Sequence, residues 1–204
     1  MQIVTVAGFW AVSMLFVITP GADWAYAISA GLTNRAAVPS VSGLLLGHLV
    51  ATIIVAIGAG ALITSVPHAT TTLTMVGAAY LLWLGVAMLR NPPKATNQDT
   101  DTQTVWWRWA LKGFGVSGLN PKVFLLFLAI LPQFTDLEAS WPVSVQMGAL
   151  GLLHVFNCAV IYIFVSVFAK AVLRSRPTVA QMVGRFSGAA MMGIAVFLIV
   201  ERIH

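Results

Sequence analysis

The sequence predicts an all-α integral membrane protein, a bundle of six transmembrane helices forming a single domain over residues 1–204. Hydrophobic residues make up 59% of the chain and charged residues only 8%, whereas a soluble domain carries about a quarter charged residues. Residues 36–89, 139–169 and 186–200 contain no Asp, Glu, Lys or Arg. Each stretch is long enough to cross about 30 Å of hydrocarbon, and the first can cross it twice. The chain therefore belongs in a lipid bilayer.

Six apolar spans follow one another along the chain. They cover residues 4–29, 39–65, 71–89, 110–133, 143–169 and 183–200. The first span has no basic segment before it and is followed by further spans, so we expect it to be retained as a helix rather than cleaved as a signal peptide. A polar connection at residues 90–109 separates a first half, residues 1–89, from a second half, residues 110–204. Residues 91–104 of this connection are predicted to be a flexible loop.

Two proline breaks interrupt the first and fourth spans, one in each half. Pro20 follows Thr19 and precedes Gly21, and Pro121 follows Asn120. Proline removes a backbone donor and clashes with the preceding turn, so we expect both helices to be broken there. Opened backbone at membrane depth is tolerated where it is buried in protein or lines a watery cavity. Breaks at corresponding places of two oppositely inserted three-helix halves are typical of a transporter with a 3+3 inverted repeat.

Basic residues predict the orientation of these spans. Nine fall on one side of the membrane and only Arg202 on the other. The nine are Arg35, Arg90, Lys94, Arg108, Lys112, Lys170, Arg174, Arg176 and Arg185. By the positive-inside rule the first side is cytoplasmic, and both termini face outward across the cell (inner) membrane. This placement in short loops beside apolar runs explains the net charge of +5 without a nucleic-acid partner.

Two charged residues accompany the breaks. Asp23 can be a proton site or a partner for a substrate ammonium, because a carboxylate at this depth costs about 3 kcal/mol to insert. The alternative for Asp23 is an N-cap of the second half-helix. Lys122 can extend to the cytoplasmic headgroups, meet a substrate carboxylate, or pair with Asp23. The charge-free ranges 36–89 and 139–169 contribute no further charged residue to the site.

The backbone at the breaks predicts a further part of the binding site. Helix N-termini after Pro20–Gly21 and Pro121 present unpaired amides with a positive dipole, which suit a carboxylate. Thr19 and Asn120 can add polar side chains. With Asp23 holding an ammonium, these groups would together bind a zwitterionic amino acid.

A second tier of polar residues lies within the apolar spans. His48 is in the second span, and His154 and Asn157 are one turn apart in the fifth. They can extend a polar path or relay protons, or they can form interhelical hydrogen bonds. Gly43 and Gly47 are four residues apart, a spacing that favours close helix packing within the chain or in a homo-oligomer.

An enzyme is the first alternative to a transporter. Ser117 within Gly115-Val116-Ser117-Gly118, followed by His154, has the residue types of an intramembrane serine hydrolase, which would need a base and oxyanion donors in a wet cavity. A second alternative is a non-transporting membrane assembly module in which the charged residues form a structural lock. No Walker loop, paired cysteine cluster or HExxH motif occurs. We therefore expect no cofactor and no metal, and Cys158 alone cannot form an intrachain disulfide.

Ordered motifs along nearly the whole chain resemble the LysE/RhtB family of amino-acid exporters, in its RhtB-like branch. They are residues 19–23 (TPGAD), 43–48 (GLLLGH), 77–85 (GAAYLLWLG), 120–122 (NPK) and 131–134 (LPQF). One difference is Ala22, where the family commonly has a second proline. The resemblance implies export of amino acids or their derivatives from the cytoplasm, by proton antiport. Its implied partners are the amino-acid substrate, protons and the lipid bilayer.

Overall fold

Every regular element in the described part of the chain is a helix, which confirms the all-α class. The computed structural model describes residues 3–19, 21–32, 36–66, 68–90, 105–172 and 177–203. Its elements are α1 (Ile3–Ile18), α2 (Ala22–Leu32), α3 (Ala37–Ser65), α4 (Ala69–Arg90), α5 (Trp106–Gly118), α6 (Pro121–Ile130), the short 3-10 helix η1 (Leu131–Phe134), α7 (Val143–Val172) and α8 (Pro177–Ile203). The predicted flexible loop at residues 91–104 lies outside the described residues, as do Arg35, Arg174 and Arg176.

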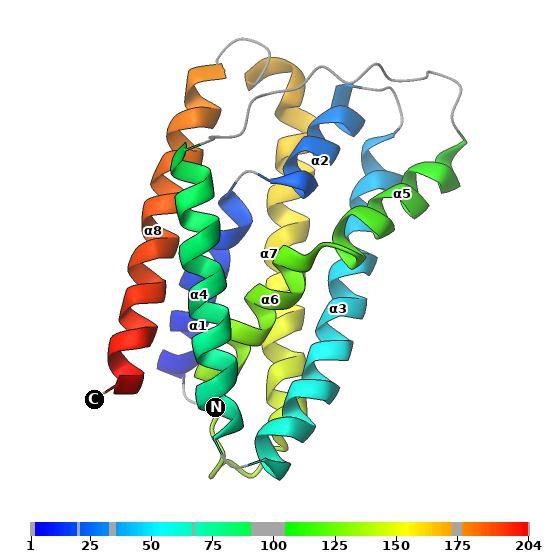
Figure 1. Ribbon diagram of the computed structural model, residues 1–204. Helices are drawn as coiled ribbons and strands as arrows, with labels where there is room; N and C mark the ends of the chain where they lie inside the picture. The colour runs from blue at the N-terminus through cyan, green and yellow to red at the C-terminus, as the bar shows by residue number, and fades with distance from the viewer. Residues whose placement is uncertain are drawn as a thin grey trace.

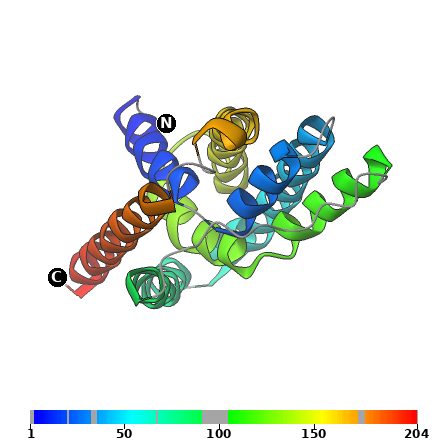
Figure 2. The same cartoon turned by 90° about the horizontal axis from the view of Figure 1, so that it is seen from above.

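The helices run lengthwise through one bundle (Figure 1). The described N- and C-terminal helix ends lie together at the bottom of that view, while α2 ends and α3 begins at the top. Helix α3 packs against α5 and α7, and α4 packs against α8. Seen from above, α4 and α8 stand on one side of the bundle and α3 and α5 on the other, with α6 between them (Figure 2).

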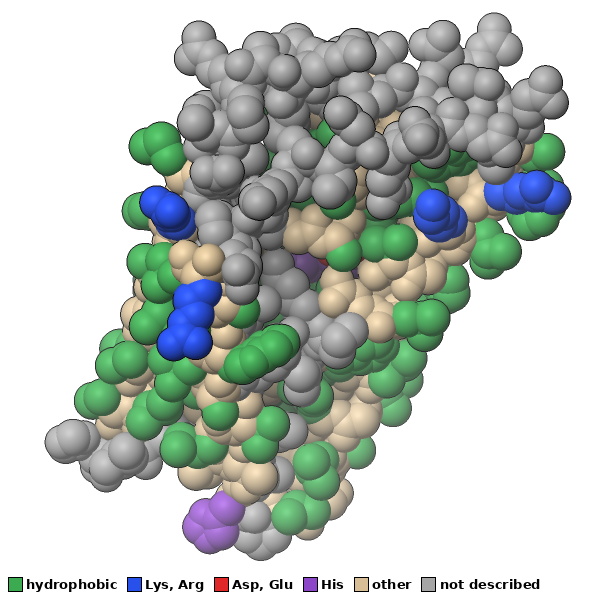
Figure 3. Space-filling view, turned by 45° about the horizontal axis from the view of Figure 1, so that its top comes forward, with side chains coloured by type: hydrophobic (Ala, Val, Ile, Leu, Met, Phe, Trp, Pro, Cys, Tyr) green, Lys and Arg blue, Asp and Glu red, His purple; other side chains and the backbone are tan. Residues whose placement is uncertain are grey.

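Among the described residues, two helices are long and apolar enough to cross a membrane, in the ranges Ala37–Ile63 of α3 and Val143–Phe168 of α7. The pair α1 and α2, bent by 63° at its break, makes a third span if it is counted as one. Hydrophobic side chains cover the outer flanks (Figure 3); on α7, Phe156 and Val167 are each 63% exposed. A helix that is apolar on its outer face as well as its inner face is suited to lipid. The count of six spans and the inverted repeat stay predictions.

Helix bounds differ from the predicted spans mainly on the basic side. Helix α5 begins at Trp106 rather than at residue 110, and α8 at Pro177 rather than at residue 183. Hydropathy locates the part of a helix that can lie in hydrocarbon, whereas the backbone hydrogen-bond ladder continues into polar and aromatic sequence. Both helices therefore extend beyond their apolar segments.

Both predicted breaks are helix ends. At the first, α1 stops at Ile18 and α2 starts at Ala22, and Pro20 itself lies outside the described residues. At the second, Leu119 and Asn120 separate α5 from α6. Pro121 is the first residue of α6, the position at which a missing N–H is least costly. The Asn120 carbonyl accepts the Val123 amide at 3.0 Å and so closes the first turn of α6.

Glycines bring α3 directly against α5. A Cβ atom on Gly43 would lie 2.0 Å from the Ala110 carbonyl oxygen, and one on Gly47 would lie 2.6 Å from the Gly118 nitrogen. Neither approach leaves room for a side chain, so the two helix backbones are in contact at these glycines. The predicted small-residue spacing therefore serves packing within the chain. It also places His48, the residue after Gly47, beside the second break.

Candidate functional site

Asp23 is buried where four helices meet. It is the second residue of α2 and only 7% exposed. Ser117 of α5 donates its hydroxyl to Asp23 Oδ1 at 2.7 Å, and Tyr162 of α7 donates to Oδ2 at 3.3 Å. His48 Nε2 of α3 lies 3.9 Å from the same Oδ2. These partners offset part of the cost of burying a carboxylate.

The hydrogen bond between Ser117 and Asp23 joins the two helix breaks. Asp23 lies in the first turn of the half-helix after the first break, and Ser117 lies in the last turn of the half-helix before the second. The N-cap alternative for Asp23 is wrong, because Gly21 occupies the position before α2 and both Asp23 oxygens accept hydrogen bonds from other helices. The carboxylate is thus aimed into the bundle.

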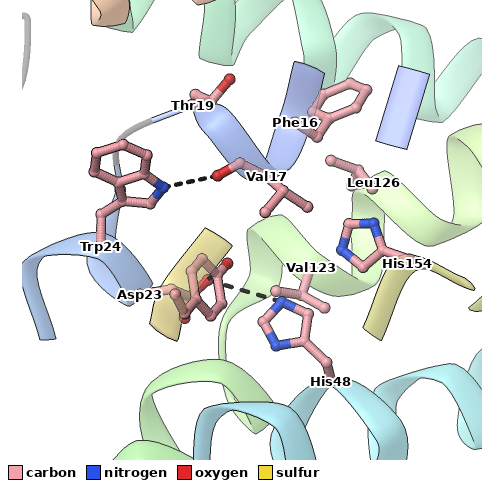
Figure 4. Close-up of a pocket in the computed structure, with 11 residues that line it drawn as sticks. Phe16, Val17, Thr19, Asp23, Trp24, His48, Val123, Leu126 and His154 are labelled. Carbon is pink, nitrogen blue, oxygen red and sulfur yellow. Dashed lines mark hydrogen bonds and ion pairs between the residues drawn. The ribbon is translucent and has the colours of Figure 1, made fainter. Parts of the chain in front are cut away.

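His48 is held in one orientation toward Asp23 (Figure 4). Its Nδ1 lies 3.0 Å from the Leu44 carbonyl oxygen. A carbonyl only accepts, so Nδ1 carries the hydrogen and Nε2 faces the carboxylate. If Nε2 also carries a proton, the His48 ring is an imidazolium that faces the Asp23 carboxylate. If Nε2 carries no proton, its lone pair faces the negatively charged Asp23 Oδ2. The pair can therefore hold a cation between its members.

A second polar group lies next to this pair. Asn157 Nδ2 donates to Ser13 Oγ at 2.9 Å, and Ser13 Oγ is 2.9 Å from His154 Nδ1. The His154 and His48 ring centroids are 5.6 Å apart. The two histidines thus connect the surroundings of Asp23 to a buried hydrogen-bonded group on α1 and α7.

A small cavity opens between these side chains. Its volume is about 20 Å³, enough for about one water molecule. Its lining consists of Phe16, Val17, Thr19, Gly21, Asp23, Trp24, His48, Val123, Leu126, His154 and Tyr162, and Figure 4 shows the side chains gathered from several helices. Small-molecule sites measure about 300 to 1,000 Å³, so in this conformation the cavity is too small to hold an amino acid.

The structure brings five of the ten predicted site residues to this cavity. Thr19, Gly21, Asp23, His48 and His154 line it. The Thr19 hydroxyl donates to the Leu15 carbonyl at 2.8 Å, so it is bonded to the last turn of α1. The side chains of Pro121 and Lys122 lie outside the described residues, and pairing of Lys122 with Asp23 stays a prediction.

Tyr162 and Ser13 are site residues that the sequence analysis does not predict. A signal existed in the fifth span, because His154, Cys158 and Tyr162 follow one another at intervals of four residues and so share one helix face. For Ser13, a single serine in an apolar run gives no comparable signal.

The serine-hydrolase alternative is wrong on geometry. Ser117 donates to Asp23 and not to a histidine, while His154 is bonded to Ser13. A nucleophilic serine needs an adjacent base within hydrogen-bond reach. The described contacts give Ser117 a carboxylate partner from another helix instead.

Comparison with known proteins decides the family. A model of LysE type translocators matches residues 14–202. The chain belongs to the LysE type translocator family. It is therefore a multi-pass membrane transporter and not an enzyme, and the predicted resemblance to the LysE/RhtB family is confirmed, while its RhtB-like branch stays a prediction.

Relatives of this translocator are similar over most of its length. An uncharacterized membrane protein of Vibrio cholerae is 28% identical over 191 residues, which covers 91% of this chain and 92% of that protein. A cysteine/O-acetylserine efflux protein of Escherichia coli is 28% identical over 147 residues, covering 71% of this chain and 75% of that protein. Its counterpart in Salmonella choleraesuis is 28% identical over 152 residues, with the same coverage. No solved structure matches this translocator.

Proposed function

We propose that this translocator exports small neutral amino acids or their derivatives from the cytoplasm across the inner membrane, in exchange for protons. The family supports transport, and the names of the efflux relatives support cysteine and O-acetylserine as the substrate class to test first. Both compounds are small zwitterions. The observation that carries the proposal is the buried Asp23 carboxylate at the meeting point of the two breaks.

Asp23 would hold the substrate ammonium. The N-terminal amides of α2 and α6, each at a helix break, would hold the carboxylate. Lys122, in the first turn of α6, is our candidate for a further contact to the carboxylate, and Asn120 and Thr19 flank it at the breaks. His48, His154 and Asn157 would extend the polar path inside the bundle.

Proton exchange would result from competition between the substrate ammonium and a proton for the Asp23 carboxylate. A buried carboxylate needs a cation beside it, which is either the substrate ammonium or a proton shared with His48. Binding one would release the other, so the two would cross in opposite directions. Each elementary charge moved inward across 100 mV supplies about 2.3 kcal/mol, enough for a gradient of about fortyfold.

Alternating access would act at the two breaks. The cavity of about 20 Å³ must open to admit an amino acid, and α2 and α5 are the half-helices whose junctions can bend. In our proposal six spans form two inverted three-helix halves, and both termini face outward. Opening toward either side would then break the Ser117–Asp23 bond.

Asp23→Asn tests this proposal. Cells preloaded with labelled cysteine or O-acetylserine should export both with the wild type, and the variant should lose export while reaching the membrane at normal abundance. Glu138→Gln, which changes an exposed acid, is the matched control and should export normally. Wild-type-like efflux by Asp23→Asn would contradict the proposed role of Asp23, and loss of the protein itself would favour the structural lock.

A further inference from the structure

His48, His154 and Cys158 form a compact buried cluster across two helices. One ligand atom from each lies within 4.8 Å of the others, and all three side chains are buried. In the part of the chain that the structure describes, this is the one group of three such residues close enough to hold a metal ion. His154 and Cys158 share a face of α7, and His48 comes from α3.

Close packing of α3 and α7 holds the cluster together. A Cβ atom on Gly151 would lie 2.1 Å from the Thr52 methyl carbon, Cγ2. Thr52 and Gly151 are each about one helical turn from the histidine on their own helix. The two backbones therefore cannot separate at this level without losing the contact.

We propose that this cluster is a binding site for Cu⁺. A thiolate is a soft donor that selects Cu⁺ and zinc over harder cations, and imidazole is a ligand that suits both metals. One thiolate neutralises a monovalent ion, so three donors and Cu⁺ make an uncharged buried group. Zn²⁺ would need a fourth ligand and a second negative charge, and the group of ligand atoms within 4.8 Å of one another contains no carboxylate.

Hydrogen bonds outside the cluster prepare both histidines for the metal. His48 Nδ1 donates to the Leu44 carbonyl, which leaves its Nε2 lone pair available. His154 Nδ1 is bonded to Ser13, itself fixed by Asn157. Metal-ligating histidines are commonly anchored in this way through their other ring nitrogen.

Metal binding requires the three ligand atoms to move only slightly closer together. Metal–ligand bonds of about 2.0 to 2.3 Å place ligand atoms nearer to one another than the 4.8 Å limit seen here. Side-chain rotation can supply that movement. The Cys158 thiol loses its proton to solvent as the copper–sulfur bond forms, and copper stays Cu⁺ throughout.

The bound ion would bridge α3 and α7 beside the cavity. His48 and His154 both line that cavity, and His48 also faces Asp23. If the proposed function holds, Cu⁺ would fix the two helices together and stop export. The binding itself does not depend on export.

Binding to the purified full-length protein tests the site. Titration with Cu⁺ held reduced, against a chromogenic Cu⁺ chelator, should show one ion per chain for the wild type. Affinity should fall at least tenfold in Cys158→Ser and in His154→Gln, and thermal unfolding without metal should show that each variant is folded. His68→Asn, at an exposed histidine outside the cluster, should bind as the wild type does.

Three results would overturn the site. They are no binding by the wild type, equal binding by folded Cys158→Ser, and an equal loss of affinity in His68→Asn. Zn²⁺ titrated alone should bind more weakly than Cu⁺, and tighter Zn²⁺ binding would overturn the choice of ion. A protein that binds Cu⁺ but exports nothing would refute the proposed function and leave the metal site standing.

Discussion

The two helix breaks differ in what they bring to the centre of the bundle. After the first break, Asp23 places a buried carboxylate at the start of α2. Before the second, Ser117 places a hydroxyl at the end of α5. The two groups meet in one hydrogen bond of 2.7 Å. One break therefore supplies the charge and the other a neutral donor that stabilises it.

The breaks are also held in different ways. The first is bridged by a side chain, because Trp24 Nε1 donates to the Val17 carbonyl at 2.7 Å across the turn (Figure 4). The second is held from outside by α3, whose Gly47 lies against Gly118. A change on the face of α3 should consequently disturb the second break first. Three single substitutions test this difference, namely Gly47→Leu, Ser117→Ala and Tyr162→Phe.

Gly47→Leu should have the largest effect. The new side chain would meet the Gly118 backbone and the Ser117 Cβ at under 3.0 Å, so α3 and α5 would have to separate. Overpacking of this kind costs about 3 kcal/mol or more where backbone cannot yield. We expect loss of membrane-inserted protein in a quantitative blot and a lower unfolding temperature in detergent.

Gly58→Leu is the matched control for Gly47→Leu. It introduces the same side chain on the same helix, where a Cβ would have no atom within 4 Å. Normal abundance is expected. Equal losses in the two variants would show that α3 tolerates no leucine at all and that the second break is not specially dependent on Gly47.

Ser117→Ala should weaken the connection between the breaks without unfolding the protein. A hydrogen bond to a charged group contributes about 1.5 to 3 kcal/mol, so we expect efflux to fall about tenfold or more. Ser140→Ala, at an exposed serine, should leave efflux unchanged.

A double variant separates the Asp23–Ser117 bond from a general packing effect. In Asp23→Asn the charged acceptor is already gone, so adding Ser117→Ala should cost less than it costs alone. Thermal stability measured for the four proteins gives the coupling, because the two variants that carry Asp23→Asn are expected to export nothing. Additive losses of stability would mean that Ser117 stabilises the protein independently of Asp23.

The sequence could locate the breaks and the acid because those signals are local. Proline limits the backbone wherever it occurs, and a charge inside an apolar run is costly enough to be rare. The proline break and the rarity of an intramembrane charge together predict Asp23 as a site residue. Charge-free runs whose length matches the bilayer predict the helices.

The partners of Asp23 could not be predicted in the same way. Ser117 is 94 residues away in sequence and Tyr162 is 139 residues away, so their approach depends on how the helices cross. The glycines beside Ser117 instead favour a nucleophilic serine, and that interpretation is wrong. For Cys158 the sequence shows only a lone thiol in an apolar span, and its closeness to His48 depends on how α3 and α7 pack.

Tyr162→Phe should have the smallest effect of the three. Its hydrogen bond to Asp23 Oδ2 is 3.3 Å long, against 2.7 Å for that of Ser117, so its loss should lower efflux by about threefold, for a bond of under about 1 kcal/mol. Tyr26→Phe is the matched control. The Tyr26 hydroxyl donates to the Trp109 carbonyl at 2.6 Å, away from Asp23, so its loss should lower the unfolding temperature more than it lowers efflux. If Tyr162→Phe instead impairs efflux more than Ser117→Ala, then α7, and not the second break, is the main support of the carboxylate.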